Sequence, residues 1–456
     1  MYFNHFYENF KDVFTYLRRE DENLPPILTC EKPNTMENDT IVRRIPQTIL
    51  KGVEEHNEEY TKEKKIDGKL AKIRDMFMNG DKHTYEMLQC KEDITFWNFL
   101  LDYFIKKNMK VVNNSWLFNE YYFYRYLSCS YDFENSNYDF FEYEKKDSIN
   151  CNRNVIEKIC TCAKGLLEMY ENKSSENAKI FDIFFYFSLW SNQFDLSWNP
   201  TKNKAEQHKS DEKDIKKKTL REKKFYFDID DINKLHDSMY LHKVLCNDVD
   251  ILRRDITSKK WTRFDIVLDN MGLEFITDLC LLHFLNFYFD EMHIHVKKFP
   301  LFVSDTMAKD ITYALDSLCN DEKYPNTVFM ANKWKKFLDT QTWKIQEHVY
   351  WNLPLPYWVM PKTLVDELKK SSFVCFKGDA NYRRCLGDLK FNFWHSHKNV
   401  LGYFPVRIIA LRCLKSPICC GVNRDIVEDL NKKSPDWCNY GEYAILQYCS
   451  PEGVPS

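Results

Sequence analysis

Polar side chains that can hold a metal ion recur at the ends of predicted strands in the second half of the chain. Asp269 and Asn270 follow the apolar run 264–268, and Asp305 follows a second short run at 301–304. In an open α/β sheet, ligands bind at the carboxyl ends of the strands, where loops and helix N-termini meet. Taken singly, an Asp or Asn before a helix is most often an N-cap. The choice between cap and ligand depends on what gathers beside these residues.

Two later strand ends add basic residues. They contribute Asp379, Asn381, Arg383 and Arg384 in "KGDANYRR", and Arg412 and Lys415 in "RCLK". A turn at Gly378 and a solvated surface lysine at position 415 would each be an ordinary explanation for one of these features. Their convergence on one edge of a sheet favours a shared site.

Such a site has the chemistry of phosphoryl transfer. Carboxylates and a side-chain amide are hard oxygen ligands that suit Mg²⁺ or Mn²⁺ and do not suit a thiolate-type zinc site. Lysine and arginine would repel that metal unless an anion lay between them, and a phosphate supplies the anion. A helix beginning near Gly272 would add backbone N–H donors. The chain has no G-x-x-x-x-G-K-[ST] loop among its 11 glycines, so water is the simplest phosphoryl acceptor.

The elements that must position these residues are short β-branched and aromatic runs that alternate with helical patterns. The runs are "RFDIVLD", "MHIHVKK", "LFVSD", "SFVCFKGD", "VRIIALR" and "YAILQYC". Alternation of this kind predicts a mainly parallel sheet with helices on both faces. We therefore expect an α/β fold, with a three-layer α/β/α Rossmann-like domain over residues 226–456.

Residues 1–200 are predicted to form a mostly helical domain packed on that sheet domain. In "RRIPQTILKGVEEHNEEY", apolar residues recur at the helix period and Pro46 fits a first helical turn. The segment "SWLFNEYYFYRYL" is aromatic on several sides, so Glu120 within it needs a partner. Residues 201–225 are rich in lysine, with ten Lys or Arg and five acids in 201–224, which predicts a charged, disordered insertion.

The bulk composition excludes several classes of protein. A formal charge of -3 over 456 residues gives no global field for nucleic acid or a membrane surface, so we expect neither as a partner; a protein partner stays unknown. The sixteen cysteines lack C-x-x-C spacing and are expected to be reduced thiols. No signal peptide and no bilayer-spanning stretch is visible. We expect a soluble intracellular protein in the cytoplasm, with the nucleus as a second compartment.

Four motifs together carry a family resemblance. "VLDNMGLEFITDL", "FVSDT", "FKGDANYRR" and "RCLK", in this order, resemble motifs of the metal-dependent damage-control phosphatases, in the acidic-residue-methyltransferase-like branch. The similarity extends from "RRIPQTI" to "YGEYAILQY", nearly the whole chain apart from its first residues and the lysine-rich insertion. It implies a phosphomonoesterase for small phosphorylated metabolites, with sugar phosphates such as fructose 1-phosphate as substrates. The implied cofactor is a divalent metal: Mn, Ni, Co or Mg.

The resemblance also implies roles for particular residues. Asp269, Asn270 and Asp305 would ligate the metal, and Asp269, Asp379 and Lys415 would be catalytic. The implied substrate-binding residues are Glu120, Asp269, Asn270, Asp379, Ala380, Asn381, Tyr382, Arg383 and Lys415. For Glu120, a structural ion pair with Arg125 or Arg44 is the alternative. Asn192 and Asp195 form either a supporting layer or a local turn.

In the expected mechanism the metal polarises the phosphoryl group and lowers the pKa of a water molecule. Lys415 and Arg383 would stabilise developing charge, and Asp379 would orient substrate hydroxyls or take a proton. Whether water or Asp269 attacks stays open, although the missing D-x-D pattern argues mildly against an aspartyl nucleophile.

One departure and two competing functions remain. The branch usually carries Arg-Thr-x-Lys where this chain has Cys413 between Arg412 and Lys415. An S-adenosylmethionine-dependent methyltransferase acting on protein carboxylates is one alternative, disfavoured by the lack of a glycine-rich loop after the first strand. A non-catalytic scaffold is the other; the retained ligand residues speak against it, and Cys413 leaves it open.

Overall fold

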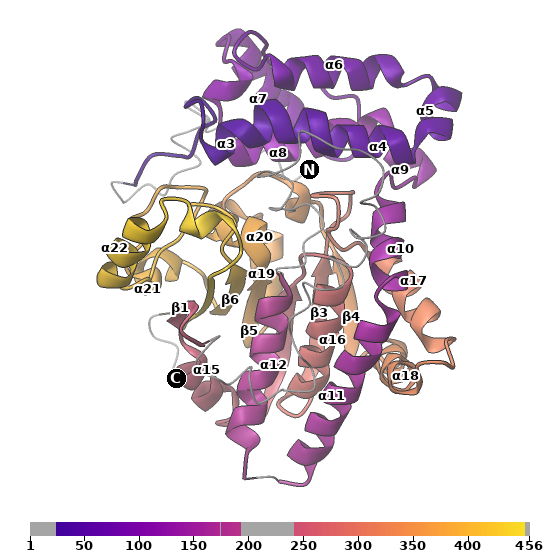
Figure 1. Ribbon diagram of the computed structural model, residues 1–456, viewed down its shortest axis with the longest axis vertical. Coiled ribbons are helices and arrows are strands. Elements are labelled where there is room, and N and C mark those ends of the chain that lie inside the picture. Colours follow the sequence, from indigo (N-terminus) through magenta and orange to yellow (C-terminus); the bar gives the residue numbers. More distant parts are fainter. Residues whose placement is uncertain (1–23, 174, 193–240, 452–456) are drawn as a thin grey trace.

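The computed structural model describes residues 24–173, 175–192 and 241–451, and a seven-stranded sheet lies at its centre (Figure 1). The strands are β1 (Val244–Asn247), β2 (Trp261–Val267), β3 (Phe289–Val296), β4 (Trp343–Glu347), β5 (Phe373–Lys377), β6 (Arg407–Cys413) and β7 (Ala444–Cys449). Their order is β1-β7-β6-β5-β2-β3-β4, and every neighbouring pair is parallel except β6 and β7. The predicted α/β fold with a mainly parallel sheet is confirmed.

Helices surround this sheet. Those before it in the chain are α3 (Met36–Asp39), the π-helix η1 (Thr40–Ile49), α4 (Leu50–His56), α5 (Glu58–Lys64), α6 (Asp67–Met78), α7 (Ile94–Lys106), the 3₁₀ turn η2 (Val111–Asn113), α8 (Trp116–Ser130), α9 (Phe133–Ser136), α10 (Glu142–Asn150), α11 (Arg153–Glu171) and α12 (Asn177–Ser191). Those among the strands are α15 (Val249–Ile256), α16 (Leu273–Leu285), α17 (Ala308–Cys319), α18 (Pro325–Asp339), η6 (Val349–Asn352), η7 (Tyr357–Val359), α19 (Lys362–Leu368), α20 (Gly378–Cys385), α21 (His397–Leu401), α22 (Arg424–Lys433) and η8 (Trp437–Asn439). Helices α3 to α9 lie together over one end of the sheet (Figure 1).

Side chains alternate between two cores, one on each face of the sheet. In β5, Phe373 and Cys375 pack with helices α11, α12 and α16, whereas Val374 and Phe376 pack with the core that contains α8. This alternation follows from the two-residue period of a strand. Because both faces are covered, the strand is fully buried and reads as an uninterrupted apolar run.

Helices that precede the strands also cover the sheet. The long amphipathic helix α11 packs on α16 and α18, and α12 packs on α16 and β6. The predicted boundary between a helical and an α/β domain stays a prediction, because residues 193–240 lie outside the described part of the chain. The predicted insertion at 201–225 falls there as well.

The prediction of a strand at "LFVSD" is wrong. Residues 301–304 form turns in which Phe302 and Val303 adopt positive φ angles of 47° and 68°, a conformation that cannot continue a strand. Only Asp305 pairs, through an isolated antiparallel bridge to Asn270. The sequence reading also missed two edge strands, β1 and β4, which are short and carry few β-branched residues.

Pro46 does not lie in a first helical turn. It falls inside η1, which has π-type backbone hydrogen bonds. Proline lacks an N–H group and its ring clashes with the carbonyl four residues before it, and a widened π-type turn relieves both effects. The irregularity matters because Arg44 of this segment reaches the cavity described below.

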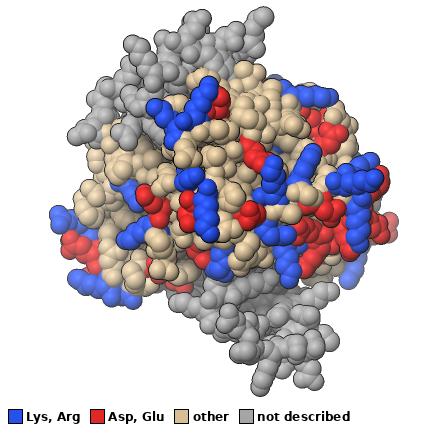
Figure 2. Space-filling view, turned by 90° about the horizontal axis from the view of Figure 1, so that it is seen from above, with Lys and Arg blue, Asp and Glu red and all other residues tan. Residues whose placement is uncertain are grey.

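Seen from above, the molecule shows interspersed charges of both signs (Figure 2). Among the described residues, exposed ion pairs one helical turn apart recur, such as Asp39 with Arg43 and Glu58 with Lys62. The described residues on this face therefore form no broad basic surface. None of the helices within the described ranges combines the length and apolarity needed to cross a membrane.

Candidate active site

A cavity of about 60 Å³ lies between the carboxyl ends of β2, β5 and β6 and the helices η1 and α8. Its lining residues are Met36, Arg44, Trp116, Glu120, Asp269, Asn270, Phe302, Asp305, Asp379, Ala380, Arg383 and Lys415. The structure thus brings together the three residues predicted to bind metal and most of those predicted to bind substrate. The location agrees with the rule that α/β proteins bind ligands beyond the carboxyl ends of their strands.

Asp269, Asn270 and Asp305 do not cap helices. The N-cap of α16 is Gly272, which has a φ of +89° and no side-chain capping bond, and the N-cap of α17 is Met307. Backbone bonds from Thr306 to the Asp269 carbonyl, at 2.8 Å, hold the two loops together. The capping interpretation is therefore wrong for these three residues, and they line the cavity instead.

Three groups fix the carboxylate of Asp269. Its Oδ2 accepts hydrogen bonds from the amides of Asn192 and Asn270, each at 3.0 Å. Gly378, with a φ of +81°, packs against the same carboxylate, and a Cβ at this position would lie 1.7 Å from Oδ2. No other residue type fits there. The supporting contact predicted for Asn192 is present, whereas Asp195 lies outside the described residues.

Glu274 connects the residues that orient Asp269. Its carboxylate accepts hydrogen bonds from Asn192 at 3.0 Å and from Asn270 at 2.8 Å, and it is 1% exposed. Both amides thus bridge the carboxylates of Glu274 and Asp269. A rigid frame of this kind fixes a ligand side chain in one rotamer.

A buried lysine balances the charge of Glu274. Lys377 Nζ lies 3.4 Å from Glu274 and 2.9 Å from Asp278, and it donates to the Ser188 hydroxyl at 2.8 Å. Burial raises the pKa of Asp278, against the effect of Lys377. Burial by itself would lower the pKa of Lys377, but the charges of Asp278 and Glu274 raise it overall. The cluster therefore places one ammonium between two carboxylates directly behind the cavity wall.

Asp305 has a cation beside it. Its Oδ2 lies 3.4 Å from Lys297 Nζ, and both side chains are 1% exposed. Lys297 is in turn 3.5 Å from the Asn381 amide oxygen. The ammonium partly neutralises the carboxylates of this wall before any ligand binds.

Asp379 is held by the loop that follows β6. Its Oδ1 accepts hydrogen bonds from Arg412 at 2.8 Å, from the backbone N–H of Lys415 at 3.2 Å and from the Ser416 hydroxyl at 3.1 Å. Arg412 is fully buried and also contacts the backbone carbonyl of Ser416. The predicted cation Lys415 lines the cavity, whereas Arg412 lies behind it and positions the loop.

Arg383 lies between two carboxylates. Its Nη1 donates to Glu120 at 2.7 Å and its Nε donates to Asp388 at 2.8 Å. Its guanidinium carbon lies 3.8 Å from the centre of the Trp116 ring, a cation–π contact. The arginine is therefore fixed before substrate arrives.

Glu120 faces the cavity from α8. Burial raises its pKa to about 7, against the opposing charges of Arg383 and, more weakly, Arg44. The predicted alternative pair with Arg125 is wrong, because Arg125 binds Asp93 and Glu134 instead. Glu120 therefore lines the cavity and also forms an ion pair with an arginine, which is Arg383.

Asn381 and Tyr382 do not line the cavity. Asn381 accepts a hydrogen bond from Tyr357 at 2.7 Å and donates to the Lys377 carbonyl at 2.8 Å, while Tyr382 donates to Gln447 at 2.9 Å. Both side chains are at most 1% exposed. Both residues belong to α20, and their hydrogen bonds hold that helix in place. Neither lines the cavity, so the structure does not place them in contact with a substrate bound there.

Cys413 points away from the cavity. Its thiol donates to the carbonyl of Leu189 in α12 at 3.3 Å, and its backbone N–H donates to Asn192 at 3.2 Å. Burial raises the pKa of the thiol to about 12, so it stays protonated. The substitution of threonine by cysteine therefore leaves the lining of the cavity unchanged.

Sequence analysis missed several residues of the site. They are Arg44, Trp116, Ser188, Glu274, Asp278, Lys297, Phe302 and Lys377. The available signal was Lys377, the last residue of the buried apolar strand "FVCFK". An ammonium at the end of a fully apolar strand must find a carboxylate inside the protein.

Comparisons with known proteins identify the family of the chain. A sequence model described as the damage-control phosphatase ARMT1-like domain matches residues 40–430. A Mus musculus protein named Damage-control phosphatase ARMT1 is 29% identical over 469 residues, covering 94% of this chain and 99% of its own. The Homo sapiens protein of that name is 29% identical, covering 90% and 96%, and the Danio rerio protein is 26% identical, covering 97% and 96%.

A crystal structure of a DUF89 family protein from Pyrococcus horikoshii is similar at a TM-score of 0.38 and 13% identity, covering 80% of this chain and 92% of that one. This likeness is too distant to support an argument about the site. The match over residues 40–430 is extensive, and the chain belongs to the ARMT1-like damage-control phosphatase family.

Proposed function

We propose that the chain is a divalent-metal-dependent phosphatase that hydrolyses small phosphorylated metabolites, with sugar phosphates such as fructose 1-phosphate as the substrate class. One observation carries the proposal. A single cavity is lined by Asp269, Asn270 and Asp305 together with Lys415 and Arg383. Hard oxygen ligands opposite cations are what a phosphate bound to a metal ion requires.

The residues present fit a divalent metal of the hard or borderline kind. Asp269, Asn270 and Asp305 offer carboxylate and amide oxygens to one cavity, and no thiol or imidazole is among its lining residues. This donor set suits Mg²⁺, Mn²⁺, Co²⁺ or Ni²⁺. When bound, the metal would supply positive charge to the phosphoryl oxygens and make water more acidic.

The remaining side chains would bind and orient the substrate. The ammonium of Lys415 would contact the phosphoryl group, and the fixed guanidinium of Arg383 would stabilise negative charge that develops there. The Asp379 carboxylate, held by Arg412 and Ser416, would accept hydrogen bonds from substrate hydroxyls. Because these donors and acceptors are held by neighbours, little reorganisation would accompany the reaction.

Glu120 would serve the sugar end of the substrate. Its carboxyl lines the cavity beside the Trp116 ring and has a pKa of about 7. Near neutral pH such a group can accept a hydrogen bond when ionised or donate one when protonated. An aromatic face beside a polar group suits a sugar, which has both C–H and O–H surfaces.

The test is release of inorganic phosphate from a panel of sugar phosphates with Mn²⁺, Co²⁺, Ni²⁺ or Mg²⁺. Asp269→Asn is expected to lower kcat/KM at least about 100-fold, because a charged oxygen ligand is lost without a change of shape. The matched control is Asp290→Asn, at an acid of β3 whose side chain is 65% exposed. Release of phosphate should not respond to S-adenosylmethionine.

No turnover of any phosphate ester with any of the four metals would refute the proposal. Calorimetric titration with Mn²⁺ provides an independent readout, since Asp305→Asn should weaken binding even where the substrate is unknown. Methyl transfer to protein carboxylates from S-adenosylmethionine would favour the methyltransferase alternative instead.

We also propose a reducing compartment, the cytoplasm, as the place of action. All sixteen cysteines lie in the described part of the chain, and each is a free thiol. Free thiols in this number are typical of cytosolic proteins.

A further inference from the structure

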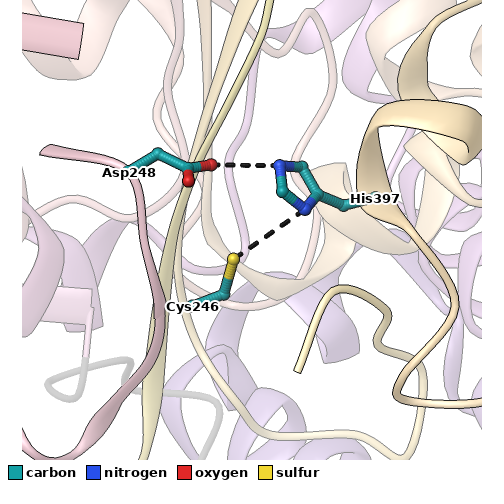
Figure 3. Close-up of side chains that lie close together, drawn as sticks. All are labelled: Cys246, Asp248 and His397. Carbon is teal, nitrogen blue, oxygen red and sulfur yellow. Dashed lines mark hydrogen bonds and ion pairs between the residues drawn. The ribbon is translucent and has the colours of Figure 1, made fainter. Parts of the chain in front are cut away.

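A second group of metal-binding side chains lies outside the cavity. Cys246 is in β1, Asp248 immediately precedes α15, and His397 is the first residue of α21 (Figure 3). Cys246 Sγ lies 3.9 Å from His397 Nδ1, and Asp248 Oδ2 lies 3.0 Å from His397 Nε2. With one ligand atom taken from each residue, the three atoms all lie within 4.8 Å of one another. None of the three residues lines the cavity at the strand ends.

The spacing is wider than that of a loaded tetrahedral zinc site by about 1 Å. Neighbouring ligand atoms around such an ion lie roughly 3.3 to 3.6 Å apart, given zinc–ligand distances of about 2.0 to 2.3 Å. The two contacts of His397 involve different ring nitrogens, Nδ1 with Cys246 and Nε2 with Asp248, so the 4.8 Å limit is the distance to compare with these values. One ring nitrogen would bind the ion, and the three side chains would move closer together around it.

Two features keep the imidazole available. His397 Nε2 is buried and, among the described residues, has no hydrogen bond of suitable geometry despite its closeness to Asp248. Gly421, with a φ of +82°, leaves space beside the ring, because a Cβ there would lie 2.7 Å from His397 Nδ1. The contact of this nitrogen with the Asp248 carboxylate at 3.0 Å is an ion pair, and a metal ion would supply the directed bond that the geometry lacks.

A Cys-His-Asp nucleophile is the competing interpretation of the same residues. Burial and the charge of Asp248 raise the pKa of the Cys246 thiol to about 12, so the free thiol is a poor nucleophile. A metal ion changes this balance, because it takes the place of the thiol proton, which is released to solvent.

A second cysteine and carboxylate cluster shows what excludes a metal. Cys90, Asp93 and Glu134 also lie within reach of one another, but the guanidinium of Arg125 binds both carboxylates. That cation already neutralises the cluster. Within the described ranges, Asp248 forms its ion pair with His397 and with no lysine or arginine.

We propose that Cys246, Asp248 and His397 hold a Zn²⁺ ion that ties the edge strand β1 and the start of α15 to α21. A thiolate and a carboxylate balance the two positive charges of the ion, and the imidazole adds none, so the complex is neutral in a half-buried place. Sulfur and nitrogen ligands favour Zn²⁺ here, in contrast to the oxygen ligands of the cavity. The site goes beyond the proposed phosphatase function and does not depend on it.

Co²⁺ is the probe that separates the two sites. The full chain is stripped with a chelator and titrated with Co²⁺, and a thiolate-to-cobalt charge-transfer band in the near ultraviolet is expected. Only a sulfur ligand produces that band, so the oxygen site of the cavity cannot mimic it. Cys246→Ser, a nearly isosteric change, should abolish the band and lower Zn²⁺ affinity at least about 10-fold. His397→Gln should weaken both the charge-transfer band and the affinity for Zn²⁺.

Two variants serve as controls. Cys90→Ser removes the thiol of the other cluster, and Asp269→Ala removes a ligand of the cavity; both should keep the band. Added Zn²⁺ should raise the Tm of the stripped wild-type chain but not that of Cys246→Ser. A wild-type chain without the band, or a band that persists in Cys246→Ser, would overturn the proposal whatever the outcome of the phosphatase assay.

Discussion

Gly378 determines where the carboxylate of Asp269 can lie. A Cβ at this position would be 1.7 Å from Asp269 Oδ2, and the φ of +81° is strained for any other residue. We therefore predict that Gly378→Ala lowers kcat/KM for phosphate release about 100-fold or more and destabilises the fold by roughly 1–3 kcal/mol. Steady-state assays and urea unfolding measure the two effects.

The control for this change is Gly165→Ala in α11. Gly165 is helical and a Cβ there meets nothing within 4 Å, so alanine should stabilise the helix by up to about 1 kcal/mol and leave activity unchanged. Wild-type activity in Gly378→Ala would show that the close approach to Asp269 has no functional meaning.

The raised pKa of Glu120 makes the stability of the protein depend on pH. Its pKa is about 7 in the fold against 4.5 in the unfolded chain, so the fold favours the protonated form. The resulting stabilisation is fully present below pH 4.5 and is lost as pH rises through 7. We predict that wild type loses about 3 kcal/mol relative to Glu120→Gln between pH 4.5 and 8.

Urea unfolding of both proteins across this range provides the measurement. Glu58→Gln, at an exposed acid of α5, should run parallel to wild type. If the difference between wild type and Glu120→Gln were the same at every pH, Glu120 would not titrate as predicted.

Among single residues, spacing revealed those that strand ends contribute to the cavity, but neither those that other segments contribute nor those behind it. Asp269, Asn270 and Asp379 could be predicted, because polar residues directly after apolar strands must lie at one edge of a parallel sheet. Glu274 and Lys377 could not, since their pairing joins α16 to the end of β5, about a hundred residues later. The lysine at the end of an apolar strand signals a buried partner, but no local pattern identifies that partner as Glu274.

The loop after β6 is an element whose shape depends on one arginine. The Nε and Nη2 of Arg412 lie 2.8 and 2.7 Å from Asp379 Oδ1, and Nη2 donates to the Ser416 hydroxyl at 2.8 Å. Lysine has a single nitrogen and cannot hold the carboxylate and the loop together. Arg412→Lys should therefore lower kcat/KM about 10- to 100-fold, mainly through a higher KM, and cost about 2–3 kcal/mol of stability.

The same change at a surface arginine tests whether the effect is specific. Arg424 in α22 pairs with the exposed Glu428 one turn away and lies 5.2 Å from the centre of the exposed Trp394 ring, and both contacts are at the surface, so Arg424→Lys should behave nearly as wild type. Equal kcat/KM and equal stability of the two variants would mean that the two nitrogen contacts of Arg412 do not position Asp379.

At the level of elements, the sequence predicted the regular strands of the sheet, but it did not predict the irregular segments beside the cavity. Periodicity located β2, β3, β5, β6 and β7 because both core faces impose it. It failed at 301–304, where an apolar run forms turns with positive φ, and at Pro46, which lies in a π-helix. In both places contacts with distant segments outweigh local preference, and both places lie beside the cavity.

Across the whole molecule, a buried lysine joins the helices that precede the sheet to the helices among its strands. Lys145 in α10 lies 2.8 Å from Asp139 and 2.8 Å from Asp310 of α17, and it is 2% exposed. Its neighbour Lys146 is 38% exposed and pairs with Glu142 on the surface. The two lysines therefore form a matched pair that differs in burial.

Removal of Lys145 leaves the carboxylates of Asp139 and Asp310 without their nearest cation, with Lys309 Nζ still 3.9 Å from Asp139. We predict that Lys145→Met destabilises the protein by about 3–5 kcal/mol at neutral pH, whereas Lys146→Met changes stability by no more than about 0.5 kcal/mol. Burial already raises the pKa of Asp310 in the wild type, and without Lys145 the pKa rises further, so protonation relieves the repulsion at lower pH. Urea unfolding near pH 7 and pH 5 should show a smaller loss at the lower value. A loss independent of pH would indicate that lost packing, and not unpaired charge, causes the destabilisation.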